Sequence, residues 1–261
     1  MKKKYNLIAG GILTGFMLFL VILGCFWTPY DPEQMDAGAK LAGVSLRHLC
    51  GGDQFGRDVF SRILVGSRTT LLVACLTVVI GATGGLVLGA FTGYFGGWID
   101  ELLMRINDVL FAFPSILLAL VVISLLGGGK YQVVLALGIA FIPSFARIVR
   151  GEFIRCRSYD YVQSARLMHA GSLRIMFVHI LPNIYPVLLS SIMIGFNNAV
   201  LAEAGMSFLG IGVQPPDSSL GRMLSEAQAY IFSAPAYALF PGVAIILLVL
   251  GFSLLADGLK R

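Results

Sequence analysis

The chain has 261 residues, of which 57% are hydrophobic and only 13% are charged, and its mean hydropathy is +0.84. Soluble domains usually carry about 25% charged residues, so the composition excludes an ordinary soluble domain. The formal net charge of +5 is explained by the membrane topology derived below and requires no nucleic-acid partner.

Six apolar runs are long enough to cross a bilayer, which takes roughly 20 residues of helix. Because the lipid interior offers no hydrogen-bond partners to the backbone, each run is expected to be a helix. The predicted spans are residues 7–27, 70–93, 108–126, 131–149, 184–208 and 238–257. We therefore predict an all-α membrane protein with six transmembrane helices and no separate soluble domain.

The distribution of basic residues predicts the orientation. With the N-terminus inside, the inner segments hold 12 of the 19 Lys and Arg residues and the outer segments hold 7. Cytoplasmic loops carry the excess of such residues, so both termini are expected to be cytoplasmic. The basic start also resembles a signal peptide, but the apolar run continues through Trp27, so a retained span is expected.

The outer loop between the first two spans is rich in glycine, and acids alternate with bases along residues 51–62. This pattern indicates an ordered loop with internal ion pairs. The loop is either a surface for an external partner or a cap that only seals the outer membrane face, and the residues alone favour neither. The candidate contacts for an external protein are Asp53, Gly56, Arg57, Asp58 and Arg62.

The inner loop, residues 158–183, predicts two short helical stretches around a turn at residues 170–172, with Pro182 closing the unit. Ser158 is the expected N-cap of the first stretch. A contact stripe at helical spacing is expected from Tyr161, Val162, Ala165 and Met168. Either this stripe docks on a soluble partner protein or the basic loop lies on anionic lipid.

The fifth span contains an ionisable residue, Glu203. A charge inside a span is costly and is by default a functional candidate. Glu203 and Asn198 either line a translocation pathway, or Glu203 forms a helix–helix hydrogen bond or reaches water at the outer interface.

Motifs for catalysis are absent from the sequence. It has no phosphate-binding G-x-x-x-x-G-K-[ST] loop, no H-E-x-x-H pair and no G-x-S-x-G elbow. The three His residues are scattered and the four Cys residues form no C-x-x-C pair, so no metal site is expected. The chain is therefore predicted not to be an enzyme, and any ATP must be hydrolysed by another chain.

The inner loop resembles the coupling-helix signature of binding-protein-dependent ABC importer permeases. Gln163, Ser164 and Ala165 stand where that signature has Glu-Ala-Ala, and residues 179–182 match its closing I-x-L-P. His169 stands where the signature has Gly, and Gly171 is expected to take over the turn. The resemblance implies that the ATPase-coupling residues are Tyr161, Gln163, Ser164, Ala165, His169, Gly171, Leu181 and Pro182.

The whole chain is similar to the second permease subunit of the dipeptide/oligopeptide/nickel family of these importers. The matching stretches are residues 29–32, 51–62, 112–114, 207–216 and 240–242. The resemblance implies the type I ABC importer permease fold. Residues 1–69 would form the first helix and the extracytoplasmic loop, and residues 70–261 a five-helix core with the coupling loop at 150–183.

The resemblance also implies a function: half of a translocation pathway in the bacterial inner membrane. The implied partners are a second homologous permease subunit, two ATPase subunits that hold ATP and Mg²⁺, an extracytoplasmic solute-binding protein and membrane lipid. No cofactor is expected on this chain. Peptides and nickel stay open as substrates. An ATP-independent channel or secondary transporter and a membrane-embedded enzyme are the alternatives, and the absence of a buried charge relay disfavours the first.

Overall fold

The computed structural model describes residues 2–259, and the side chains of residues 5–258, as helices joined by loops with no strand. The long helices are α1 (Lys2–Phe26), α2 (Val59–Phe95), α3 (Gly97–Ala112), α4 (Ser115–Leu126), α5 (Lys130–Arg157), α8 (Leu181–Phe208) and α10 (Pro235–Leu259). The short elements are η1 (Ala37–Ala39), α6 (Asp160–Leu167), α7 (Ser172–Arg174), the π-helical turn η2 (Ile175–Ile180), α9 (Leu220–Ala227) and η3 (Gln228–Tyr230).

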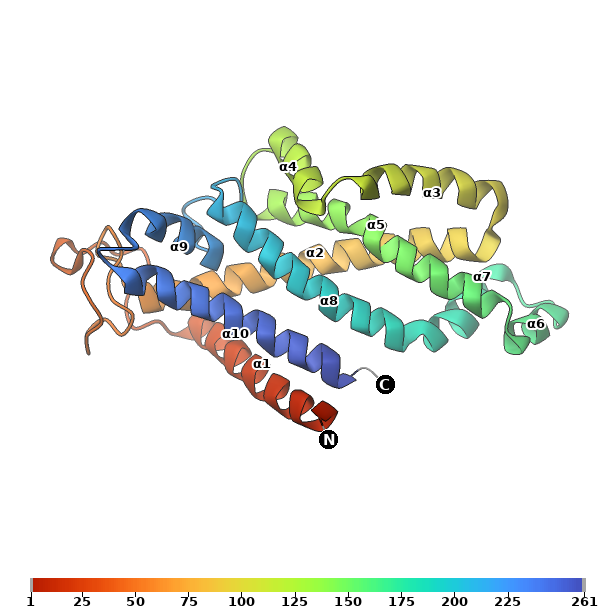
Figure 1. Ribbon diagram of the computed structural model, residues 1–261, viewed down its shortest axis with the longest axis horizontal. Coiled ribbons are helices and arrows are strands. Elements are labelled where there is room, and N and C mark those ends of the chain that lie inside the picture. Colours follow the sequence, from red (N-terminus) through yellow and green to blue (C-terminus); the bar gives the residue numbers. More distant parts are fainter. Residues whose placement is uncertain (1, 260–261) are drawn as a thin grey trace.

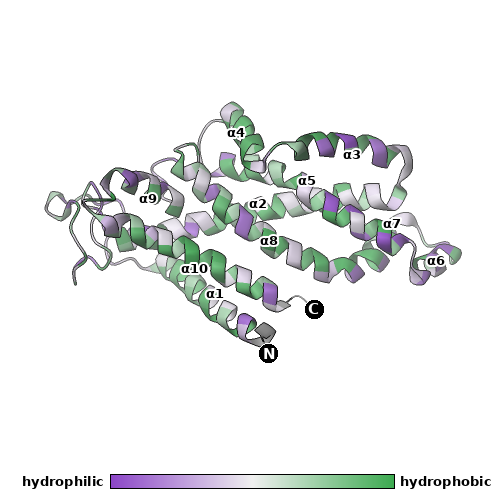
Figure 2. Cartoon of the chain, in the orientation of Figure 1, coloured by the Kyte–Doolittle hydropathy of each residue, from purple (hydrophilic) through white to green (hydrophobic). Residues whose placement is uncertain are grey.

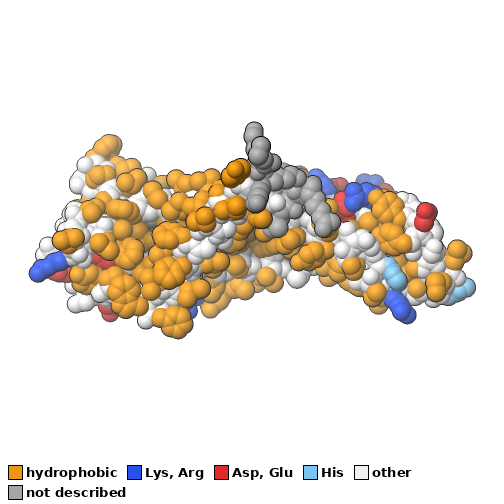
Figure 3. All heavy atoms as spheres, turned by 90° about the horizontal axis from the view of Figure 1, so that it is seen from below, with side chains coloured by type: hydrophobic (Ala, Val, Ile, Leu, Met, Phe, Trp, Pro, Cys, Tyr) orange, Lys and Arg blue, Asp and Glu red, His pale blue; other side chains and the backbone are white. Residues whose placement is uncertain are grey.

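The molecule is an elongated bundle (Figure 1). One end carries α6 and the other carries α9 with the loop of residues 27–58; we call these the α6 end and the α9 end. Hydrophobic residues dominate the long helices (Figure 2). On the face shown in Figure 3, hydrophobic side chains cover the middle and most charged side chains lie toward the ends. This distribution suits a chain whose middle lies in lipid.

Within the described part of the chain, five helical segments are long and apolar enough to cross a membrane: Tyr5–Phe26, Val59–Phe95, Lys130–Arg157, Ser172–Phe208 and Pro235–Gly258. A sixth crossing requires α3 and α4 together, and these helices meet at an angle of 93°. The prediction of one continuous span at residues 108–126 is therefore wrong. Pro114 has no N–H and keeps Phe113 extended (φ −86°, ψ 137°), which ends α3.

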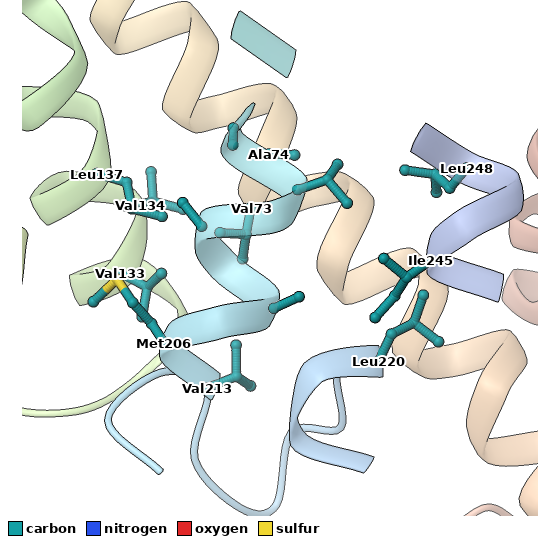
Figure 4. Close-up of a cluster of buried hydrophobic side chains, with 14 of the residues drawn as sticks. Val73, Ala74, Val133, Val134, Leu137, Met206, Val213, Leu220, Ile245 and Leu248 are labelled. Atoms are coloured by element: carbon teal, nitrogen blue, oxygen red, sulfur yellow. The ribbon is translucent and has the colours of Figure 1, made fainter. Parts of the chain in front are cut away.

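The core lies where α2, α5, α8, α9 and α10 meet (Figure 4). Val73 and Ala74 of α2 face Val134 and Leu137 of α5, and Met206 of α8 is completely buried beside them. The helix α2 passes without a break through residues 69 and 70, so the expected division at that point coincides with no end of an element.

Closest packing occurs between α2 and α5. Four glycines spaced four residues apart lie on one face of α2, and each lies against α5: Gly81, Gly85, Gly89 and Gly93. Residues four apart share a helix face, and in a membrane such small residues let two backbones approach closely. The α1–α10 pair packs similarly, with Gly258 against Leu7, so the two ends of the chain lie side by side.

The helical run at residues 172–208 is longer than the predicted fifth span of 184–208, and Pro182 does not end the preceding helix. Pro182 instead stands in the first turn of α8, where its missing N–H costs no hydrogen bond. Just before it, the Leu181 N–H donates to the carbonyl of Met176, five residues back. This wider turn carries the chain into α8 without a break.

Candidate functional site

The helix α6 is fastened to the end of the bundle by its own apolar face. Val162 and Ala165 are buried, at 0% and 7% exposure, against the ends of α2 and α5 and against η2. The prediction that Val162 and Ala165 belong to an outward contact stripe is therefore wrong, because their side chains pack inside the chain. Tyr161 is half-buried beside Cys156, and burial raises the pKa of the Tyr161 phenol to about 12.

Polar contacts hold α6 from its other sides. The Arg166 guanidinium lies over the ring of Tyr94, 5.4 Å from its centroid, which is within range of a cation–π interaction. Arg157 Nη1 donates to the carbonyl of Tyr94 at 3.2 Å, and Gln163 Nε2 donates to the carbonyl of Arg157 at 3.2 Å. Gln163, which stands where the signature has Glu, thus joins α6 to the end of α5.

The turn after α6 depends on His169, whose φ is +57°. This left-handed conformation favours glycine, which is the residue that the signature has there. The Ala170 N–H donates to the carbonyl of Ala165, and the His169 N–H donates to that of Arg166, the pattern of a Schellman helix end. Gly171 has φ −63°, so the prediction that Gly171 takes over the turn is wrong.

The start of α6 also differs from the prediction. Tyr159 is its N-cap residue, without a side-chain cap bond, whereas the Ser158 hydroxyl donates to the carbonyl of Arg155 at 2.9 Å. Ser158 thus belongs to the end of α5.

The surface that α6 offers to solvent is its C-terminal turn. Leu167 and Met168 are 79% and 82% exposed, and Leu173 after the turn is 58% exposed. Gln163, Ser164 and His169 are exposed on the same segment, as is Pro182, whereas Leu181 is half-buried. Large apolar side chains at this exposure, carried on a rigid support, are typical of a docking surface.

A groove of about 330 Å³ lies between α4, α5 and α8. The four polar side chains in its wall are Ser115, Ser144, Ser191 and Asn198. The remaining lining residues are Ile116, Phe141, Phe145, Ile148, Ile194, Gly195, Leu201 and Ala202. Ser115 directly follows the bend at Pro114, and Ser144 follows Pro143 inside α5. No sequence pattern indicated these serines, since an isolated Ser in an apolar span carries no signal.

The two residues expected to line a pathway are separated by the structure. Asn198 lies in the groove wall, but Glu203 is absent from it and has 0% exposure. The Ser207 hydroxyl donates to Glu203 Oε1 at 2.7 Å and accepts from the Val213 N–H at 3.0 Å. The hydroxyls of Thr70 and Ser219 lie near this carboxylate, but Glu203 Oε2 makes no hydrogen bond to a described residue. Through Ser207, Glu203 is linked to Val213 in the loop that follows α8.

The residues expected to contact an external protein are mostly inside the chain. Asp53, Asp58 and Arg62 are 0%, 3% and 4% exposed, Gly56 is buried, and Arg57 is half-buried. Side chains buried to this extent do not form a contact surface for an external protein. Their burial instead favours the second interpretation of the loop, a cap with internal ion pairs. Asp58 caps α2 by accepting from the Ser61 N–H at 2.8 Å, and it also pairs with His48 at 2.9 Å.

An ion-pair cluster at the α9 end joins the loop to three helices. Arg62 Nη1 lies 2.7 Å from Asp53 Oδ2 and 2.9 Å from Glu226 Oε2. Arg57 and Arg222 also pair with Glu226, and the Tyr237 hydroxyl of α10 donates to it at 3.1 Å. Burial opposes the charge on Glu226, but the charge of Arg62 and its hydrogen bond outweigh this and lower the pKa of Glu226. No sequence pattern indicated the role of Glu226, because Arg57 and Arg62 lie 169 and 164 residues away from it in the chain.

The sequence of this chain is similar to those of known membrane transport proteins. Residues 85–261 match the family model described as "Binding-protein-dependent transport system inner membrane component". The chain is 42% identical over 254 residues to the glutathione transport system permease protein GsiD of Pectobacterium atrosepticum, covering 95% of this chain and 84% of that protein. It is 45% identical to GsiD of Salmonella paratyphi A over 263 residues, covering 99% and 86%.

A solved structure shows the same fold. A chain of the inward-facing MetNI methionine ABC transporter matches with a TM-score of 0.64 and 18% identity, covering 75% of this chain and 93% of that one. The predicted type I ABC importer permease fold is thereby confirmed. The family match and the GsiD relatives also confirm the resemblance to the peptide/nickel-type group. The chain belongs to the binding-protein-dependent inner membrane components, as a multi-pass permease subunit of a bacterial ABC importer.

Proposed function

We propose that this chain forms half of a translocation pathway and couples partner ATPase subunits to the uptake of short peptides, with glutathione as the first candidate. ATP and Mg²⁺ are held by the partner chains, so this chain is a mechanical, non-catalytic subunit. A second permease subunit completes the pathway, and a solute-binding protein delivers the solute at the α9 end. The α6 end and both termini face the cytoplasm.

The observation that carries the coupling role is the exposed turn of Leu167 and Met168 on a helix whose opposite face is buried. Because Val162 and Ala165 pack into the ends of α2 and α5, a displacement of the turn moves these helices with it. Arg166 precedes the turn and Arg174 follows it in the chain, and both side chains are exposed, so a partner groove with an apolar floor and an acidic rim would complement it.

The substrate proposal rests on the relatives. The GsiD proteins, at 42–45% identity over nearly the whole chain, are named as glutathione permeases. Glutathione is a short peptide, which agrees with the peptide branch of the expected substrates. Uptake of labelled glutathione, a labelled dipeptide and labelled nickel in cells with and without this chain tests the proposal. Loss of glutathione or dipeptide uptake supports it, and loss of nickel uptake alone overturns the peptide assignment.

Coupling is tested by placing charges on the turn. The double variant Leu167→Asp, Met168→Asp should abolish co-purification of the ATPase subunits and ATP-driven uptake while the chain stays in the membrane. Leu46→Asp is the matched control, because Leu46 is 99% exposed at the opposite end; it should keep the ATPase subunits bound. Full uptake by the double variant, or uptake without ATP, would favour the ATP-independent transporter instead.

A further inference from the structure

The groove between α4, α5 and α8 holds three polar side chains with unused hydrogen-bonding capacity. Ser191 donates to the carbonyl of Val187 at 2.9 Å within its own helix. Ser115, Ser144 and Asn198 make no side-chain hydrogen bond to any other described residue, and Ser144 and Asn198 are exposed in the groove. A hydroxyl and a carboxamide each donate and accept. The groove therefore offers donors and acceptors from three different helices.

The rest of the wall is apolar and uncharged. Phe141 and Phe145 of α5 and Ile194 of α8 flank the polar groups. Among the described residues that line the groove there is no Asp, Glu, Lys, Arg, His or Cys. The carboxylate of Glu203, five residues beyond Asn198, is buried outside the groove wall and accepts a hydrogen bond from the Ser207 hydroxyl. No lining side chain therefore supplies an electrostatic preference for one sign of charge.

We infer that this groove is a peptide-binding subsite that reads main-chain amide groups through Ser115, Ser144 and Asn198 and is indifferent to the net charge of the peptide. A peptide main chain presents alternating N–H donors and C=O acceptors, which neutral donor–acceptor side chains can satisfy in either direction. The aromatic and aliphatic wall contacts the peptide side chains without ion pairing. This inference rests on the proposed function, since the peptide must pass along this chain.

The same wall is unsuited to a bare divalent cation. Nickel and similar ions bind imidazole and thiolate groups strongly, and the groove has neither in the part of the chain described. A lone amide and two hydroxyls are weak replacements for the hydration shell of such an ion. A nickel ion alone is therefore not expected to occupy this site.

The test uses the assembled transporter with single cysteines at Ser144→Cys and Asn198→Cys, in a chain whose exposed Cys25 and Cys75 are replaced by Ser. Anionic and cationic thiosulfonate reagents, each normalised to its rate with a small free thiol, should modify each cysteine at rates within about threefold of one another. Millimolar trialanine, and its analogues with a central Glu or Lys, should slow modification to similar extents. Nickel ion is not used as a protectant, because it would bind the introduced thiolate itself.

Two variants calibrate the readout. Leu117→Cys on α4 lies outside the groove wall and is 53% exposed; it should react with neither reagent, because it faces lipid. Adding Asn198→Asp to the Ser144→Cys chain should slow the anionic reagent about fivefold relative to the cationic one, and should weaken protection by the Glu-containing peptide most.

Two results would overturn the inference: normalised rates for the two reagents that differ tenfold or more, or equal modification with and without every peptide. Failure of the proposed function is seen separately. In that case, deletion of the chain would leave peptide uptake unchanged, whatever the chemistry of the groove in the purified complex.

Discussion

Gly89 of α2 lies directly against the main chain of Ala146 in α5: a Cβ atom on Gly89 would come within 2.5 Å of the Ala146 carbonyl oxygen. The two helices are therefore as close as their backbones allow. Similar close contacts with α5 occur at the other three glycines on this face of α2, Gly81, Gly85 and Gly93. Because the obstacle is backbone, it cannot move aside as a flexible side chain would.

Gly89→Ala should destabilise the chain for this reason. Overpacking typically costs about 1–3 kcal/mol, which lowers the melting temperature by roughly 2–4 °C per kcal/mol in a chain of this size. Thermal unfolding of the detergent-purified chain measures the effect. Gly205→Ala is the control, because nothing lies within 4 Å of the added methyl group; it should be neutral or slightly stabilising. Equal melting temperatures for both variants would contradict the close contact.

The glycine stripe also shows what the sequence can predict. Five of the six spans were predicted from apolar length, because α1, α2, α5, α8 and α10 satisfy the bilayer requirement directly. The bend between α3 and α4 was missed because residues 108–126 are apolar on both sides of Pro114. Hydropathy indicates whether a segment can lie in an apolar environment, but it does not indicate whether the helix is straight or bent.

The candidate site was predicted unevenly for a similar reason. The sequence predicted a helix where α6 lies, but it placed the turn at residues 170–172 instead of at His169. Helical spacing also could not tell which side of α6 faces the bundle, and Ala165 faces inward. In the outer loop, alternating charges predicted the ion pairs. The burial of these ion pairs could not be predicted, because it depends on Glu226 and Tyr237, which lie more than 160 residues away from the loop in the chain.

His169→Gly should stabilise the end of α6. A non-glycine residue in the left-handed region costs roughly 1–2 kcal/mol, and His169 sits there with φ +57°. Hydrogen exchange of the Ala170 amide, which donates to the carbonyl of Ala165, should slow about fivefold if about 1 kcal/mol is recovered. Gly171→Ala is the matched control, because its φ of −63° suits any residue and no atom lies within 4 Å. Faster exchange in His169→Gly would show that the imidazole stabilises the turn.

The ion pair between Asp100 and Arg150 fastens α3 to α5. Arg150 Nε and Nη2 donate to the two carboxylate oxygens at 2.6 and 2.7 Å, a bidentate geometry. Asp100→Ala should release the start of α3 and expose it to protease, and Arg150→Ala should do the same. The double variant Asp100→Arg, Arg150→Asp should restore much of the protection.

The exposed pair on the same helix is the control for that experiment. Glu101 and Arg105 lie 2.7 Å apart, but their side chains are 64% and 76% exposed, and such surface pairs contribute little. Glu101→Ala should therefore leave the protease pattern unchanged. If Glu101→Ala releases α3 as strongly as Asp100→Ala, the charge of the helix and not the bidentate pair holds it in place.

Acid should loosen the α9 end through Glu226. The pKa of Glu226 is lowered from its ordinary 4.5 in the folded chain. A lowered pKa means that the charged form favours folding, so this stabilisation is fully present above pH 4.5 and is lost as the pH falls through the folded-state pKa. Protonation removes this carboxylate from Arg57, Arg62 and Arg222 together, and leaves Asp53 to pair with Arg57 and Arg62. Hydrogen exchange in α9, measured from pH 6 to pH 3 and divided by the intrinsic exchange rate at each pH, should rise below pH 4.5.

Glu226→Gln should reproduce the acid effect at neutral pH and abolish its pH dependence. Removing one of the two carboxylate partners of the buried Arg62, which keeps Asp53, should cost up to about 3 kcal/mol, seen as faster exchange in α9 and in residues 53–57. Glu33→Gln is the control, because Glu33 is exposed and makes no ion pair with the arginines of the cluster. This variant should keep the wild-type dependence of hydrogen exchange on pH. A Glu226→Gln chain that still loosens below pH 4.5 would contradict the assignment of the acid effect to Glu226.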